Sequence, residues 1–76
     1  MDRRGDLAAA ALDLFAERNF ASVTIKDIAG VAAVNTALIY YYFDSKEDLF
    51  RAAIEFAVDQ VFQNFRQLQA RHGDPA

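Results

Sequence analysis

The stretch that decides the fold is residues 24–49, TIKDIAGVAAVNTALIYYYFDSKEDL. Its apolar residues recur at intervals of three and four, which is the spacing of helices with one buried face. Thr24 is typical of a helix start, because its hydroxyl accepts a free backbone N–H and Asp27 adds negative charge to the first turn. We therefore expect one helix over residues 24–32 and a second over residues 36–42.

Only three residues, Ala33, Val34 and Asn35, connect these two predicted helices. So short a connection leaves no chain for an antiparallel return, and the helices must cross at a steep angle. The small side chain of Ala29 allows the two helices to approach closely. The residues expected to converge on one interior are Ile28, Ala29, Ala32, Val34, Ile39, Tyr42 and Phe43.

The opposite face of the second helix is uncharged. It carries Asn35, Thr36, Ala37, Tyr40 and Tyr41. This composition is unusual for a helix that faces only water, but it suits a helix that lies in the major groove of DNA and contacts base edges. The pattern therefore favours a helix-turn-helix that binds DNA.

A first helix is expected before this unit. Leu7, Ala11 and Leu14 recur at helical spacing and predict a helix over residues 6–18. Asn19 is expected to end it, because asparagine tolerates the left-handed conformation that commonly stops a helix.

A long fourth helix is expected after the unit. Ser45 and Asp48 form a start that resembles a capping box, and apolar residues continue at helical spacing to about Gln69. Ile54 and Ala57 are expected to complete the small core. The rest of the helix is too long for the other three to cover. Its far end carries apolar residues that would form a contact surface, namely Phe56, Phe62, Phe65 and Leu68.

The expected fold class is therefore all-α, a three-helix domain with a helix-turn-helix plus the start of a long fourth helix. We divide the chain into a flexible N-terminal arm at residues 1–5, the DNA-binding domain at residues 6–56, and a distal fourth helix with a frayed tail at residues 57–76. Arg3 and Arg4 fall in the arm, where we expect disorder in the free protein and where contact with DNA phosphates is the alternative.

Composition limits the other function classes. The 76 residues contain no cysteine, which excludes disulfides and thiolate metal sites. No catalytic Ser/His/Asp set, metal-spaced cluster or glycine-rich phosphate loop is present, so we expect no enzyme, metal or cofactor. No apolar run approaches the roughly 20 residues that span a bilayer, and we expect a cytoplasmic protein without membrane contact.

Several of these residues together resemble the TetR family of bacterial transcriptional regulators. The most specific element is the string Tyr-x-Tyr-Phe-x-Ser-Lys-Glu at residues 40–47, and the resemblance covers about residues 7–56. The matching residues are Leu14, Phe15, Phe20, Thr24, Asp27, Ile28, Ala29, Val34, Ile39, Tyr40, Tyr42, Phe43, Ser45, Lys46, Glu47 and Leu49. Where the family usually has glycine, this chain has Asn19 after the first helix and Ala33 at the tight turn.

The resemblance implies which residues meet DNA. Those implied to meet bases or the adjacent sugar-phosphate are Asn35, Thr36, Ala37, Leu38 and Tyr41. Those implied to contact phosphates are Tyr40, Tyr42, Lys46 and, at the start of its helix, Thr24. We add Lys26 as a candidate phosphate contact; a lysine that faces solvent or a nearby acid is the alternative there.

The resemblance also implies partners for a full-length protein. These are a double-stranded, palindromic operator, a second copy in a homodimer, and a small-molecule inducer that acts through a further domain and relieves repression. The net charge of 8 − 11 = −3 leaves one alternative open, a helical protein-interaction module that keeps the fold without binding DNA. A positive surface around Thr36, Tyr40 and Lys46 would favour DNA, and an acidic one would favour the protein partner.

Overall fold

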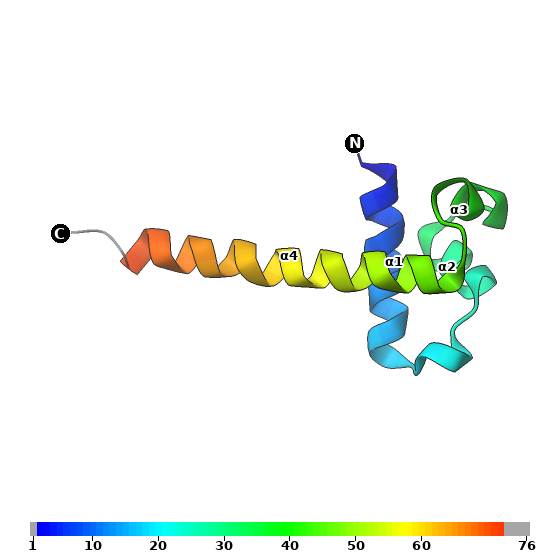
Figure 1. The fold of residues 1–76 in the computed structure, drawn as a ribbon, viewed down its shortest axis with the longest axis horizontal. Helices are drawn as coiled ribbons and strands as arrows, with labels where there is room; N and C mark the ends of the chain where they lie inside the picture. The colour runs from blue at the N-terminus through cyan, green and yellow to red at the C-terminus, as the bar shows by residue number, and fades with distance from the viewer. Residues whose placement is uncertain (1, 73–76) are drawn as a thin grey trace.

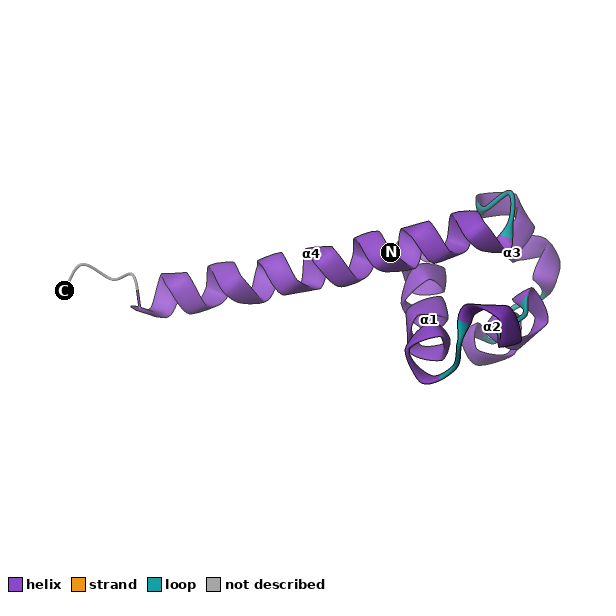
Figure 2. Ribbon diagram, turned by 60° about the horizontal axis from the view of Figure 1, so that its bottom comes forward, coloured by secondary structure: helices purple, strands orange, loops and turns teal. Residues whose placement is uncertain are grey.

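A computed structural model describes residues 2–72, with side chains to residue 69, and confirms the all-α class, since no strand occurs in that range (Figures 1 and 2). The elements are α1 (Arg3–Glu17), the 3₁₀ turn η1 (Phe20–Ser22), α2 (Ile25–Ala32), α3 (Thr36–Tyr42) and α4 (Lys46–His72). The end of the expected frayed tail, residues 73–76, lies outside the described residues.

The molecule consists of a packed head and a protruding helix. The first turns of α4 cross α1, and α2 and α3 pack beside this crossing (Figure 1). The rest of α4 extends away from the other helices (Figure 1). The overall dimensions are 52 × 27 × 19 Å. We call α1, η1, α2, α3 and residues 46–57 the head, and the rest of α4, residues 58–72, the distal arm.

The core of the head agrees largely with the predicted interior. Ile28, Ala29, Ile39 and Phe43 are buried, and the other predicted members, Ala32, Val34 and Tyr42, are partly buried against them. The remaining buried residues of this cluster come from α1, the segment before α2, and α4. They are Leu7, Ala8, Ala11, Val23, Leu49, Ala52 and Ala53.

Helix α1 begins at Arg3, three residues before the predicted start. Residues 3–5 therefore form its first turn, where the sequence predicted a flexible arm. The Asp6 backbone N–H already donates to the Asp2 carbonyl at 2.9 Å. The Arg4 guanidinium also lies 5.0 Å from the centre of the Phe43 ring, a cation–π contact that holds this turn against the head.

The end of α1 differs from the prediction. Asn19 has φ −72° and ψ 160°, an extended conformation, so the expected left-handed stop is wrong. Its side-chain oxygen instead accepts from the Ser22 backbone N–H at 3.0 Å and starts η1, an element that the sequence analysis missed. Asparagine is as well suited to this local cap as to a left-handed position, and the cap is what forms here.

The start of α4 agrees with the prediction, and its packing corrects two residues, Ile54 and Phe56; Phe56 was expected in the exposed contact surface but is partly buried against the head. The Ser45 hydroxyl accepts from the Asp48 backbone N–H at 3.1 Å. Leu49, Ala53 and Phe56 face the head, whereas Ile54 is 45% exposed and does not complete the core. Residues 49, 53 and 56 share one helical face, and position 54 lies well off it because each residue turns the helix by about 100°.

Candidate nucleic-acid interface

Helix α2 is held at its start by two reciprocal hydrogen bonds. The Asp27 backbone N–H donates to the Thr24 hydroxyl oxygen at 3.0 Å, and the Thr24 backbone N–H donates to the Asp27 carboxylate at 3.1 Å. That backbone N–H is the main reason why the pKa of Asp27 lies below its usual value; the Thr24 hydroxyl and then the Arg18 guanidinium, 3.4 Å away, lower it further. The ion pair between Arg18 and Asp27 thereby links the start of α2 to the end of α1.

The turn between α2 and α3 depends on one left-handed alanine. Ala33 has φ 60° and ψ 42°, and among the described residues it is the one non-glycine with positive φ. Two hydrogen bonds close the turn, from the Val34 N–H to the Ala29 carbonyl at 3.0 Å and from the Ala33 N–H to the Gly30 carbonyl at 3.3 Å. The structure confirms that Ala33 occupies the position where glycine is usual, at a steric cost of about 1–2 kcal/mol.

Helix α3 has its own cap, which changes the role available to Asn35. The Asn35 side-chain oxygen accepts from the Leu38 backbone N–H at 3.0 Å. Only the amide NH₂ of Asn35 is then free to donate to a base. From the sequence this residue is expected on the outer face only, although asparagine before a helix is also a signal for a cap.

The outer face of α3 is exposed as predicted. Tyr41 is 79% exposed and Tyr40 is 54% exposed. Thr36 and Ala37 are exposed, and Leu38 is partly buried. A face with two large aromatic side chains open to solvent has no role in packing the head, so it is available for a partner.

A shallow hollow gathers most of the predicted base-contacting residues. It is lined by Arg3, Val34, Asn35, Ala37, Leu38 and Tyr41. The structure thus brings four of the five predicted residues to one place, and Thr36 lies outside the lining. From the sequence, Arg3 is expected in a disordered arm, with phosphate contact as the alternative; its position four residues before Leu7 was the one signal that the helix reaches back to it.

The predicted phosphate-contacting residues are more dispersed. Lys26 is exposed and lies beside a different hollow, which is formed by residues of α1 and α2 and by Arg18 just after α1. Tyr42 is partly buried, and its ring packs edge-on against Tyr41, with 5.0 Å between the ring centres. Thr24 is exposed, but its hydroxyl oxygen already accepts the hydrogen bond that caps α2.

Lys46 has a structural role that the sequence did not indicate. Its ammonium group donates to the carbonyls of Phe20 at 2.9 Å and Val23 at 3.0 Å. It also lies 4.2 Å from the centre of the Phe20 ring. The prediction treated Lys46 as a free surface cation, whereas it is partly buried and has one N–H left to offer a phosphate.

A short capped helix, a tight three-residue turn and a second capped helix with an exposed outer face define a helix-turn-helix domain. The family model "Bacterial regulatory proteins, tetR family" matches residues 7–53. The chain therefore belongs to the tetR family of DNA-binding transcription regulators. This family consists of regulators and not of enzymes.

Curated relatives agree with this membership. The HTH-type transcriptional repressor KstR2 of Rhodococcus jostii is 35% identical over 68 residues, 90% of this chain and 33% of the relative. The HTH-type transcriptional activator FasR of Mycolicibacterium smegmatis is 33% identical, over 87% of this chain and 30% of the relative. The HTH-type transcriptional dual regulator CecR of Shigella flexneri is 43% identical, over 79% and 26%. The chain thus spans between a quarter and a third of the length of these relatives.

No solved structure matches this chain. Within residues 2–72, none of the helices combines the length and apolar character needed to span a membrane.

Proposed function

We propose that this chain binds a specific double-stranded DNA sequence by inserting α3 into the major groove. The observation that carries the proposal is the outer face of α3, which is uncharged and aromatic and yet largely exposed, with Tyr41 at 79% and Tyr40 at 54%. Capped ends and the closed turn hold α3 firmly on α2. A rigid reading helix of this kind reaches base edges without a further loss of backbone freedom on binding.

The contacts divide into two kinds. Base edges or adjacent sugars are contacted by Asn35 through its amide NH₂, and by Thr36, Ala37, Leu38 and Tyr41. Phosphates are contacted by Thr24, Lys26, Tyr40, Tyr42 and the remaining N–H of Lys46. Contacts of the second kind set the position of the domain on DNA, and those of the first kind select the sequence.

We further propose that the distal arm serves assembly in a full-length regulator. Its large apolar side chains are about half exposed or more, namely Val58, Val61, Phe62, Phe65 and Leu68. A patch of this kind normally marks a contact surface. In the full-length protein it would pack on a dimerising, inducer-binding domain that sets two copies of α3 about 34–36 Å apart on a palindromic operator in the cytoplasm. Relief of repression by the inducer is the proposed mode, although the relatives include an activator.

Selection from a random duplex pool tests sequence-specific binding. The chain is fused to a heterologous dimerisation module so that two copies of α3 act together, and enriched duplexes are sequenced. We expect one half-site motif. If no motif emerges at low salt, sequence-specific binding is wrong, and the interaction-module alternative gains support.

Two variants separate base contacts from phosphate contacts on the selected duplex. Thr36→Ala should change sequence preference, with about 1–3 kcal/mol lost on the selected sequence and little on a scrambled one. Tyr40→Phe should weaken binding to both duplexes alike, since it removes only a hydroxyl that meets a phosphate. Equal losses on both duplexes for Thr36→Ala would remove Thr36 from base contact.

A further inference from the structure

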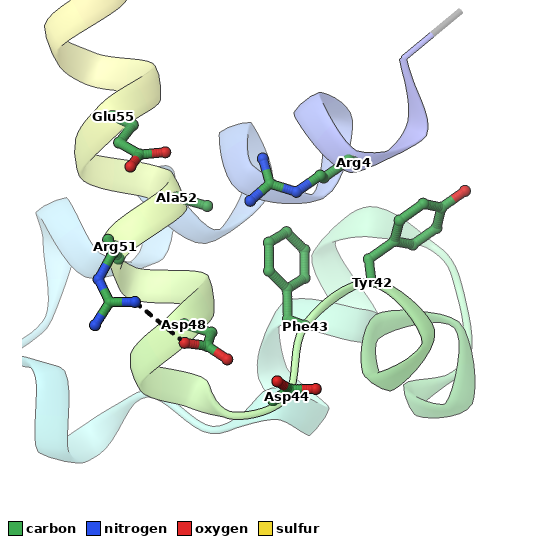
Figure 3. Close-up of a pocket in the computed structure, with 8 residues that line it drawn as sticks. All are labelled: Arg4, Tyr42, Phe43, Asp44, Asp48, Arg51, Ala52 and Glu55. Atoms are coloured by element: carbon green, nitrogen blue, oxygen red, sulfur yellow. Dashed lines mark hydrogen bonds and ion pairs between the residues drawn. The ribbon is translucent and has the colours of Figure 1, made fainter.

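The first turn of α1 lies against the reading helix. Arg4 reaches from α1 over the ring of Phe43, the residue that ends α3 (Figure 3). Phe43 is itself buried, so the contact joins the start of α1 to the core at the α3–α4 corner. Figure 3 also shows Tyr42 at the edge of this pocket, with its hydroxyl directed away from the Arg4–Phe43 pair.

Arg3, the neighbouring residue, lines the hollow at α3. The other lining residues, Val34, Asn35, Ala37, Leu38 and Tyr41, are all uncharged. Arg3 is exposed, and within the described residues the ion pairs form at Arg18 with Asp27 and at Arg51 with Asp48. The guanidinium of Arg3 is therefore the charged group of the hollow, and no acid in the described residues forms an ion pair with it.

The head has few other cations to offer DNA. Arg18 and Arg51 are paired with acids, and Lys46 is bonded to two carbonyls. Lys26 lies beside a different hollow. A chain of net charge −3 needs local positive charge where it meets a phosphate backbone, because phosphate neutralisation drives nonspecific DNA binding.

We infer that Arg3 is part of the DNA-binding surface, where its guanidinium contacts a backbone phosphate beside the groove that α3 enters. Arg4 is a positioning residue, because its contact with Phe43 holds the turn that carries Arg3. This inference rests on the proposed function, since it assumes that α3 faces DNA. It requires no operator sequence, because a phosphate contact forms on any duplex.

The salt dependence of binding tests the role of Arg3. A fluorescent 20-base-pair duplex of mixed sequence is titrated with the 76-residue chain between about 25 and 200 mM KCl, and anisotropy gives the binding constant. Each phosphate contact contributes about −0.9 to the slope of log K against log salt. Arg3→Gln should make the slope shallower by about one and weaken binding several-fold at the lowest salt. Arg3→Lys should keep the slope, because the positive charge remains.

The matched control is Arg66→Gln, which removes the same charge from the distal arm and should leave the slope unchanged. Circular dichroism melts verify that each variant stays folded. If Arg3→Gln and Arg66→Gln give equal slopes while the unaltered chain binds, the inference about Arg3 is overturned and DNA binding stands. If neither the unaltered chain nor its dimerised fusion binds the duplex even at the lowest salt, the proposed function and this inference both fall.

A second variant tests the positioning role of Arg4. Arg4→Gln removes the cation–π contact with Phe43 but leaves Arg3 in place. We expect weaker amide protection in the first turn of α1, measured by hydrogen exchange, together with a loss of affinity beyond that of Arg66→Gln. Unchanged protection there would overturn the positioning role of Arg4.

Discussion

The helix-turn-helix of residues 25–42, which we call the reading unit after its proposed role, and the distal arm are both helical, but for opposite reasons. Helices α2 and α3 have 8 and 7 residues, well below the roughly 12–15 at which an isolated helix becomes marginally stable. Their caps and the core of the head hold them. The distal arm only continues α4, a helix of 27 residues, and its large apolar side chains are exposed. A helical pattern in sequence therefore does not tell which helix depends on tertiary contacts.

Among the tests of this comparison, removal of a core side chain should change the free energy of unfolding most. Leu49 is fully buried where α4 enters the head. Leu49→Ala should lower the free energy of unfolding by about 2–5 kcal/mol, because it removes apolar contacts and leaves a cavity. Urea denaturation measures the loss. The matched control is Leu68→Ala in the distal arm, where the side chain is 53% exposed and the change should stay within about 0.5 kcal/mol. Equal losses would mean that the arm shares the core of the head.

Glycine at the turn should stabilise the reading unit. Ala33→Gly removes the steric cost of φ 60°, but it also increases the freedom of the unfolded chain, so we expect a gain of at most about 1 kcal/mol. Ala32→Gly, one residue earlier inside α2, should instead cost about 0.5–1 kcal/mol. Thermal melts of both variants decide the matter. A lower midpoint for Ala33→Gly would show that the left-handed turn is not under strain in solution.

The capping box of α2 should make a small, pH-dependent contribution. The pKa of Asp27 is lowered in the folded chain, so its stabilisation is complete above the usual carboxyl value of about 3.9 and is lost as the pH falls through the lowered value. Asp27→Asn keeps an oxygen for the Thr24 N–H but does not titrate. The midpoints of the two proteins should differ at pH 7 and converge toward pH 2. Parallel curves over that range would show that ionised Asp27 contributes nothing to α2.

Glycine in the distal arm should leave the midpoint of the head unchanged. Gln63→Gly costs about 0.5–1 kcal/mol of local helix, because glycine loses more backbone freedom than other residues. The far-ultraviolet helical signal should fall, while the tyrosine signal of the head melts at the original temperature. Ala53→Gly, in the buried part of the same helix, should lower that temperature. A lower head midpoint for Gln63→Gly would show that the arm and the head unfold as one unit.

The sequence predicted those elements whose signals are local. Thr24 and Ser45 mark helix starts, and the short link at residues 33–35 determines the turn, so the bounds of α2 and α3 were predicted correctly. The left-handed position of Ala33 was also predicted, because Ala33 stands at the place in this link where glycine is usual. These features depend on neighbours in the chain, and such neighbours are visible in the sequence.

The features that the sequence did not predict depend on contacts between distant segments. The first turn of α1 is ordered by Arg4 against Phe43, and η1 is held to the start of α4 by the ammonium of Lys46, which donates to the Phe20 carbonyl. The spacing of apolar residues along the chain does not indicate which distant residues form such pairs. The same limit applies to the DNA contacts, because residue types on a face indicate a partner but not which side chain reaches which atom.

The hydrogen bonds of Lys46 have a consequence for the order of folding. They join the start of α4 to carbonyls 23 and 26 residues earlier, so they close a ring of chain that contains all of α2, the turn and α3. When that ring closes, the chain within it loses conformational entropy, and this cost must be met before the hydrogen bonds stabilise the closed state. Local helix formation in α2 and α3 shortens the ring, and we expect the Lys46 bonds to form late, after the reading unit has docked. Once closed, the ring limits the chain entropy that the reading unit gains when it opens, so we expect it and the first turn of α4 to exchange their amide protons as one cooperative unit.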